Sequence, residues 1–179
     1  MPRISACLLA FVVAISSGCE VTDLVGPESS PDGAPVEMSE ARYVLTATDV
    51  GWLGELDFTF HNVTHRTISL LNCRGGFSLR LEKWDGDDWL PAWHPVLLGC
   101  LSPPIEIQPG ESHDHTLGVF SGHPDSNHYP RFSVEPIDGT YRLVILGAFW
   151  DYDHDGPPWG QPPPLDARVS DPFEIATAG

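Results

Sequence analysis

Apolar side chains recur at every second position along two segments of the chain, and this period of two restricts the fold more than any other feature. Leu56, Phe58 and Phe60 alternate with polar residues, and the same alternation returns across residues 77–82. A period of two places successive side chains on opposite faces, which is typical of half-buried strands. Residues 140–150, apolar at nearly every position, indicate a central strand covered on both faces. No window sustains an amphipathic helix, so the sequence predicts an all-β fold.

Turn-forming residues separate these segments at short intervals. Pro109-Gly110 suits the central positions of a type II turn, because proline presets the first φ and glycine accepts the positive second φ. The other turn signals lie at residues 62–65, 85–87, 138–139 and 156–158. Short strands with frequent turns predict an antiparallel β-sandwich, and residues 41–179 have the usual size of one domain.

The N-terminus has the layout of an export signal. Arg3 precedes an apolar run over residues 4–15, and small residues then lead to Cys19. The run is shorter than the roughly 20 apolar residues that cross a bilayer as a helix. The segment resembles the lipobox of bacterial lipoproteins, although Ser16 stands where that motif usually has leucine. This resemblance implies cleavage after residue 18, acylation of Cys19 and a lipid anchor at the cell envelope; an ordinary cleaved signal peptide and an uncleaved anchor are the alternatives.

Proline, glycine, serine and acidic residues dominate residues 20–40, which carry no sustained apolar period. This composition is typical of a flexible tether. The sequence therefore predicts a lipoprotein signal peptide at residues 1–18, an acylated cysteine and flexible linker at residues 19–40, and a single β-sandwich domain at residues 41–179.

The cysteine count is compatible with an oxidising compartment. Cys7 would leave with the signal and Cys19 would carry the lipid, so Cys73 and Cys100 remain. Two remaining thiols in an exported chain predict one disulfide, which would stabilise the fold by roughly 3 to 4 kcal/mol. A reactive or metal-binding pair is the alternative, but no second thiol lies near either residue and no CxxC spacing is present.

Acidic residues dominate the charge of the chain. The formal net charge is −16, and removal of Arg3 with the signal leaves 8 basic and 25 acidic residues, a net charge of −17. Such a surface repels nucleic acid phosphates and anionic headgroups. We therefore expect no nucleic acid partner, and we expect membrane attachment through the lipid alone.

Several strand and turn landmarks resemble those of bacterial immunoglobulin-like domains carried on lipoproteins and other surface proteins. They are Asn62, residues 85–89, residues 109–112, residues 139–143 and residues 170–173. The resemblance implies that the Tyr141 hydroxyl bonds back to upstream backbone as a tyrosine corner, and it implies no enzymatic activity. Cys73 and Cys100 depart from the antibody pattern, which has inter-sheet spacing around an intervening core tryptophan.

An acidic loop is the clearest candidate for a metal site. Asp151, Asp153 and Asp155 alternate before Gly156, so their carboxylates could wrap a hard cation such as calcium. Pro162 stands where the bidentate glutamate of an EF-hand would be, and no flanking helices are predicted, so a true EF-hand is excluded. A looser calcium site and a solvated acidic loop are the two interpretations.

Histidines and tryptophans supply the other candidate sites. His113 and His115 would share one face of a strand and could bind zinc or copper with a third ligand, or could simply form polar surface. Trp84, Trp89 and Trp93 cluster around one predicted hairpin, where they could contact protein or glycan or pack in the core.

No nucleophile elbow, phosphate-binding loop or free cysteine beside a base is present, so we expect no catalytic residues. The leading interpretation is a non-enzymatic, surface-tethered binding or structural module. The alternatives are a calcium-binding envelope protein that uses residues 151–156 and a periplasmic protease inhibitor that presents residues 122–130.

Overall fold

The computed structural model describes residues 34–97, 99–123, 125–153 and 160–178. Strands dominate these residues, which confirms the all-β prediction. The strands are β1 (Val36–Met38), β2 (Arg42–Thr48), β3 (Gly51–His61), β4 (Ile68–Leu70), β5 (Asn72–Cys73), β6 (Gly76–Phe77), β7 (Leu79–Trp84), β8 (Trp89–Trp93), β9 (Ile105–Ile107), β10 (Ser112–Gly122), β11 (Gly139–Ile145), β12 (Ala148–Phe149) and β13 (Phe173–Ala178). One 3-10 turn, η1 (Leu165–Ala167), precedes β13.

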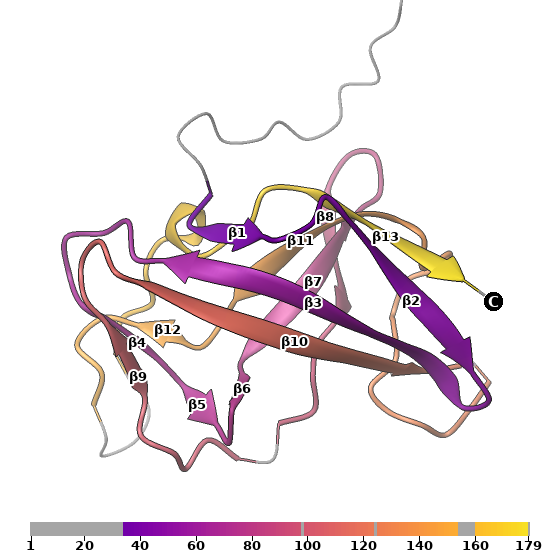
Figure 1. The fold of residues 1–179 in the computed structure, drawn as a ribbon, viewed down its shortest axis with the longest axis horizontal. Helices are drawn as coiled ribbons and strands as arrows, with labels where there is room; N and C mark the ends of the chain where they lie inside the picture. Colours follow the sequence, from indigo (N-terminus) through magenta and orange to yellow (C-terminus); the bar gives the residue numbers. More distant parts are fainter. Residues whose placement is uncertain (1–33, 98, 124, 154–159, 179) are drawn as a thin grey trace, which may run out of the picture.

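Eight strands form one sheet that folds around the core (Figure 1). β3 pairs with β10 along its whole length and, on its other side, with β1 and β2. β2 continues the sheet to β13, β11, β7 and β8 in that order. Smaller sheets, β12-β4-β9 and β5-β6, close one end. In Figure 1, β3 and β10 run side by side across the face formed by β7 and β11.

The pairing of β2 with β13 is parallel, whereas the sequence predicted an antiparallel sandwich. All other strand pairs are antiparallel. The chain travels around the core before β13 returns to the edge of β2, and Phe173 and Ile175 of β13 point into the core at 3% and 1% exposure. The parallel pair thus joins the two ends of the domain and covers a strand edge that would otherwise be open.

The core lies between the β3–β10 ladder and the β7–β11 ladder. Leu56, Phe58 and Phe60 are buried on the inner face of β3, as the alternation predicted. The opposing ladder contributes a set of fully buried aliphatic side chains. They are Leu79, Leu81, Leu143 and Ile145.

Tyr141 sits at the start of β11 with no exposed surface. Its hydroxyl donates a hydrogen bond to the backbone oxygen of Ile137 at 2.5 Å, which confirms the predicted backbone contact. Burial raises the pKa of the Tyr141 phenol far above its usual value of 10. The phenol therefore stays protonated and ties the turn before β11 to the core.

The predicted strand over residues 140–150 is divided in two. β11 ends at Ile145 because the amides of Leu146 and Gly147 both turn to donate to the oxygen of Ser78. β12 then starts at Ala148 in a different sheet. Within β11, Val144 on the outer face is fully buried, so both faces of the strand are covered at this position, as expected. The backbone of Val144 also forms a bridge to Val169 along the edge of the strand.

The folded domain starts before the predicted boundary at residue 41. Val36 in β1 lies opposite Phe60 of β3 and is fully buried. Its apolar side chain therefore forms part of the inner face of the β3 ladder. Residues 36–38 therefore belong to the sheet and not to the linker. The predicted signal peptide, Cys19 and the first part of the linker lie outside the described residues. In the described part of the chain, no helix is long and apolar enough to cross a membrane.

The disulfide between Cys73 and Cys100 is present, as predicted. Cys73 ends β5 in the small β5–β6 hairpin, and Cys100 lies in the segment that leads to β9. The bond closes a loop with a sequence separation of 27 residues. It holds Cys100, which precedes β9, against the β5–β6 hairpin at one end of the domain.

Candidate functional site

The β7–β8 hairpin carries all three tryptophans that the sequence indicates as contact candidates, Trp84, Trp89 and Trp93. Its turn is built around Asp85, whose side chain accepts hydrogen bonds from the amides of Asp88 at 2.8 Å and Asp87 at 2.9 Å. These amide donors hold the pKa of the Asp85 carboxyl below its usual value. The tight turn sets Trp84 directly opposite Trp89 in the ladder.

Trp84 and Trp89 form a tilted aromatic pair with ring centroids 5.4 Å apart. Both side chains are half-buried. The guanidinium of Arg142 lies 4.6 Å from the centre of the Trp89 ring, on the side of the sheet. The pair is therefore held from behind and keeps part of its aromatic surface in contact with solvent.

Trp93 does not belong to this surface, which corrects the prediction for this residue. It is 3% exposed, and its Nε1 donates to the oxygen of Phe120 at 2.9 Å. Simple alternation would place Trp93 on the same face as Trp89, four residues earlier. A bulge in the β7–β8 ladder between Leu81 and Glu82 shifts the register by one residue, so Trp93 turns into the core opposite Leu81.

A hollow of about 360 Å³ lies at the same hairpin and is bordered by Trp84 but not by Trp89. The side chains of Lys83 and Leu90, one position along each strand, point to the face opposite the aromatic pair. The hollow is lined by Lys83, Trp84, Asp85, Leu90, Val134, Glu135 and Pro136. Leu90 is 40% exposed at its rim. The ammonium of Lys83 donates to the backbone oxygen of Pro136, and desolvation lowers the pKa of Lys83. The hollow thus combines apolar walls with one cation and two carboxylates, a composition suited to binding a ligand.

A buried ion cluster supports the pair from within the sheet, and the sequence analysis did not find it. Glu82 is 2% exposed and binds Arg80 and Arg142, its Oε2 accepting from Nε of Arg142 at 2.7 Å. Arg142 and Glu82 lie directly opposite each other in the β7–β11 ladder. Arg142 was the one charged residue within the apolar segment 140–150, and that isolated charge was the signal that a buried partner existed.

The predicted calcium loop is only partly described. Asp151 has a positive φ of 50° and forms an ion pair with Arg66. Asp155 and Gly156 lie outside the described residues. Among the residues that the structure describes, no three His, Cys, Asp or Glu side chains are arranged to hold a metal ion. Asp151 would have to exchange its guanidinium partner for a cation in order to act as a ligand.

His113 and His115 share one face of β10, as expected. Both rings contact Phe77, with centroid distances of 5.6 Å for His113 and 4.3 Å for His115. Burial, with a further contribution from His113, lowers the pKa of His115. Asp114 points to the opposite face, where its Oδ1 accepts from Oγ1 of Thr59. The pair therefore packs half-buried against an aromatic ring, and it lacks a third metal ligand in the described part of the chain.

The segment proposed as an inhibitory loop leaves the end of β10. The amide of Gly122 donates to the oxygen of Pro130 at 2.9 Å, which closes the base of the loop. Inside it, Arg131 donates to the Tyr129 hydroxyl at 2.6 Å and to the oxygen of Ser126 at 3.0 Å. Tyr129 is 67% exposed. Pro124 lies outside the described residues.

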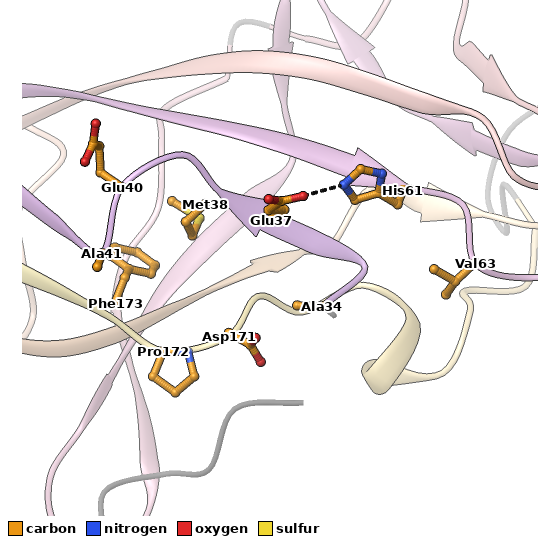
Figure 2. A pocket seen from close by; sticks show the side chains of 10 residues that line it. All are labelled: Ala34, Glu37, Met38, Glu40, Ala41, His61, Val63, Asp171, Pro172 and Phe173. Carbon is orange, nitrogen blue, oxygen red and sulfur yellow. Dashed lines mark hydrogen bonds and ion pairs between the residues drawn. The ribbon is translucent and has the colours of Figure 1, made fainter. Parts of the chain in front are cut away.

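A second hollow, of about 500 Å³, lies where β1 enters the domain (Figure 2). Its polar rim contains Glu37 and His61, whose Oε2 and Nε2 lie 3.1 Å apart, together with Glu40 and Asp171. The other ring nitrogen of His61 lies 2.7 Å from the Ser112 hydroxyl. His61 is thus held on the outer face of β3 by a carboxylate at one ring nitrogen and by a serine hydroxyl at the other.

Comparison of the sequence with models of known protein families and with curated proteins found no match.

Proposed function

We propose that the protein is an exported, lipid-anchored module with an immunoglobulin-like sandwich, which binds a protein or glycan partner at the cell envelope and performs no catalysis. The contact region is the hairpin surface, defined as Trp84 and Trp89, whose side chains lie on one face of the β7–β8 ladder. Cys19 would carry the anchor, and residues 20–35 would separate it from the sandwich.

The observation that carries this proposal is the half-buried Trp84–Trp89 pair, whose Trp89 ring stacks on the guanidinium of Arg142. Aromatic side chains lose little conformational entropy on binding and supply a large contact area, so they dominate many protein and glycan contacts. Arg142 behind Trp89 fixes the ring before any partner arrives. Such preorganisation lowers the entropic cost of association.

Three further observations support the location and the fold. The net charge of −16 opposes attachment to anionic membranes through the protein surface, so a lipid is the suitable means of attachment. The contact of Tyr141 with Ile137 has the form of a tyrosine corner, which is a feature of immunoglobulin-like sandwiches. The disulfide is compatible with an oxidising compartment.

The test compares binding of the full-length chain and its variants to isolated cell-wall glycan and to solubilised envelope proteins of a bacterial host. We expect Trp84→Ala and Trp89→Ala each to weaken binding at least about tenfold, as residues at the centre of a contact do. Tyr129→Ala is the matched control, because it removes an aromatic ring that is 67% exposed and belongs to the loop after β10, outside the hairpin surface. Equal binding by all variants, with unchanged melting temperatures, would refute the hairpin surface as the contact region.

A further inference from the structure

β10 is an edge strand of unusual length. It runs for 11 residues, Ser112–Gly122, and among the strands of the described residues it pairs with β3 alone. The ladder is antiparallel and has no break in register from Ser112 opposite His61 to Gly122 opposite Gly51. A long, regular edge presents a row of backbone donors and acceptors to any chain that can pair with it.

Hydrogen bonds at both ends of β10 show which of its backbone amides and carbonyls point toward β3 and which point outward. The oxygen of Glu111 accepts from the amide of Asn62, so odd-numbered residues face β3. Even-numbered residues face outward, as the bond from Trp93 to the oxygen of Phe120 shows. The outward amides and carbonyls of Asp114, Thr116 and Gly118 have no hydrogen-bond partner among the described residues. We call this row the β10 edge.

A hollow of about 350 Å³ lies beside the β10 edge, on the inner side of the strand. The residues that line it include Cys73 of the disulfide, Phe77, Leu97, His115 and Leu117. Val96, also at this hollow, is 59% exposed. A strand added to β10 would direct alternate side chains toward these groups, and their apolar surface suits aliphatic residues.

The outer side of the same ladder is acidic. Oδ1 of Asp114 accepts from the Thr59 hydroxyl at 2.8 Å, and Oδ1 of Asp57 accepts from the Thr116 hydroxyl at 2.5 Å. The threonines fix both carboxylates at the surface, and each retains a second oxygen for another donor. The remaining side chains of an added strand would face these carboxylates, which suits lysine or arginine.

We infer that the β10 edge accepts an extended segment of a partner protein as an added strand, in which lysine or arginine alternates with aliphatic residues. The basic side chains face Asp114 and Asp57, and the aliphatic side chains enter the hollow beside Phe77. This mode of recognition combines backbone hydrogen bonds with side-chain pockets of two kinds. A second copy of the acidic chain is disfavoured as the occupant because its net charge is −16. The inference does not depend on the hairpin surface.

The experiment measures amide hydrogen exchange in the full-length chain with and without a short synthetic peptide in which lysine alternates with valine. We expect the peptide to slow exchange at Thr116 and Gly118 by about tenfold or more, because their amides gain hydrogen bonds. The amides of His115 and Leu117 already bond to β3, so their exchange should not change. This alternation distinguishes strand addition from adsorption to the acidic face.

Variants of the chain give an independent readout. Gly118→Pro removes an outward donor but leaves the β3 ladder intact, and no atom lies within 4 Å of an added Cβ at this position. We expect it to abolish binding of the peptide, while the control Gly118→Ala retains it. Asp114→Asn should weaken binding several-fold, whereas the control Asp166→Asn, at an exposed carboxylate in η1, should not.

Three outcomes would overturn the inference. Peptide binding without protection at Thr116 and Gly118 would place the contact elsewhere. Equal binding of a peptide that alternates glutamate with valine would remove the charge argument. Protection that appears without peptide and rises with protein concentration would identify a second copy as the occupant.

Discussion

Replacement of Glu82 by glutamine should destabilise the protein more than any other loss of a single charge that the described structure presents. The Glu82 side chain is 3% exposed and is bound by Arg80 on one oxygen and by Arg142 on the other. Glutamine keeps the volume of the side chain but removes its charge. Two arginines then remain in the sheet without a counter-charge.

The expected magnitude follows from burial. Loss of one partner from a buried ion pair costs about 3 to 5 kcal/mol. Arg142 and Arg80 are 20% and 37% exposed, so water partly solvates them in the variant and the loss falls toward the lower limit, about 3 kcal/mol. For a domain of this size, each kcal/mol lowers the melting temperature by about 2 to 4 °C, so we expect a decrease of roughly 10 °C.

Urea unfolding followed by tryptophan fluorescence measures the free energy directly, and an unchanged denaturant slope shows that the comparison is valid. Glu37→Gln is the control, because its carboxylate also binds a basic side chain but is 72% exposed; we expect a change below about 0.5 kcal/mol. The double variant Glu82→Gln/Arg142→Gln should lose less than the sum of the single losses. A free energy of unfolding for Glu82→Gln within about 0.5 kcal/mol of the unmodified protein would refute the reasoning.

Three other predictions concern covalent structure, pH and calcium. Reduction of the Cys73–Cys100 bond should lower the free energy of unfolding by roughly 3 to 4 kcal/mol, and intact mass should rise by two hydrogens; ready alkylation of both thiols without reductant would contradict this. The pKa of His115 is lowered in the fold from 6.5, so the unfolded chain binds the proton first. The free energy of unfolding should therefore be constant well above pH 6.5 and decrease as the pH drops through 6.5. Urea titrations at several pH values measure this decrease, and it should be smaller in His115→Gln. Millimolar calcium should not raise the melting temperature, because Arg66 already occupies Asp151; a clear rise that Asp151→Asn removes would support the calcium loop instead.

Local patterns predicted the parts of the fold that depend on near neighbours in sequence. The alternation of Leu56, Phe58 and Phe60 identified the inner face of β3, since a strand alternates wherever it lies. The two remaining cysteines left one pairing, and Cys73 bonds to Cys100. Tyr141 was placed at a turn by the residues before it, and its hydroxyl reaches the backbone of that turn.

The burial of Trp93, Glu82 and Val36 depends on segments that are distant in sequence, so local patterns did not predict it. The burial of Trp93 results from a bulge in β7–β8 pairing, and a single sequence does not show where a ladder will shift register. The alternation of residues 77–82 predicts Glu82 on the solvent-facing side of a half-buried strand. In the structure it is buried, because β11 pairs with β7 and places Arg142 opposite it. Val36 lay in a segment of linker composition, and only its position opposite Phe60 makes it part of the core.

The proposed display of the domain from a membrane would require a lipid on Cys19, and the mass of the mature N-terminus tests this proposal most directly. The chain should be purified from membranes of a bacterial host and its N-terminal peptide analysed by mass spectrometry. We predict a chain that begins at Cys19 and carries the additional mass of a diacylglyceryl group. An unmodified chain with another start, or one that retains Met1, would contradict the lipid anchor and the envelope-tethered function that depends on it.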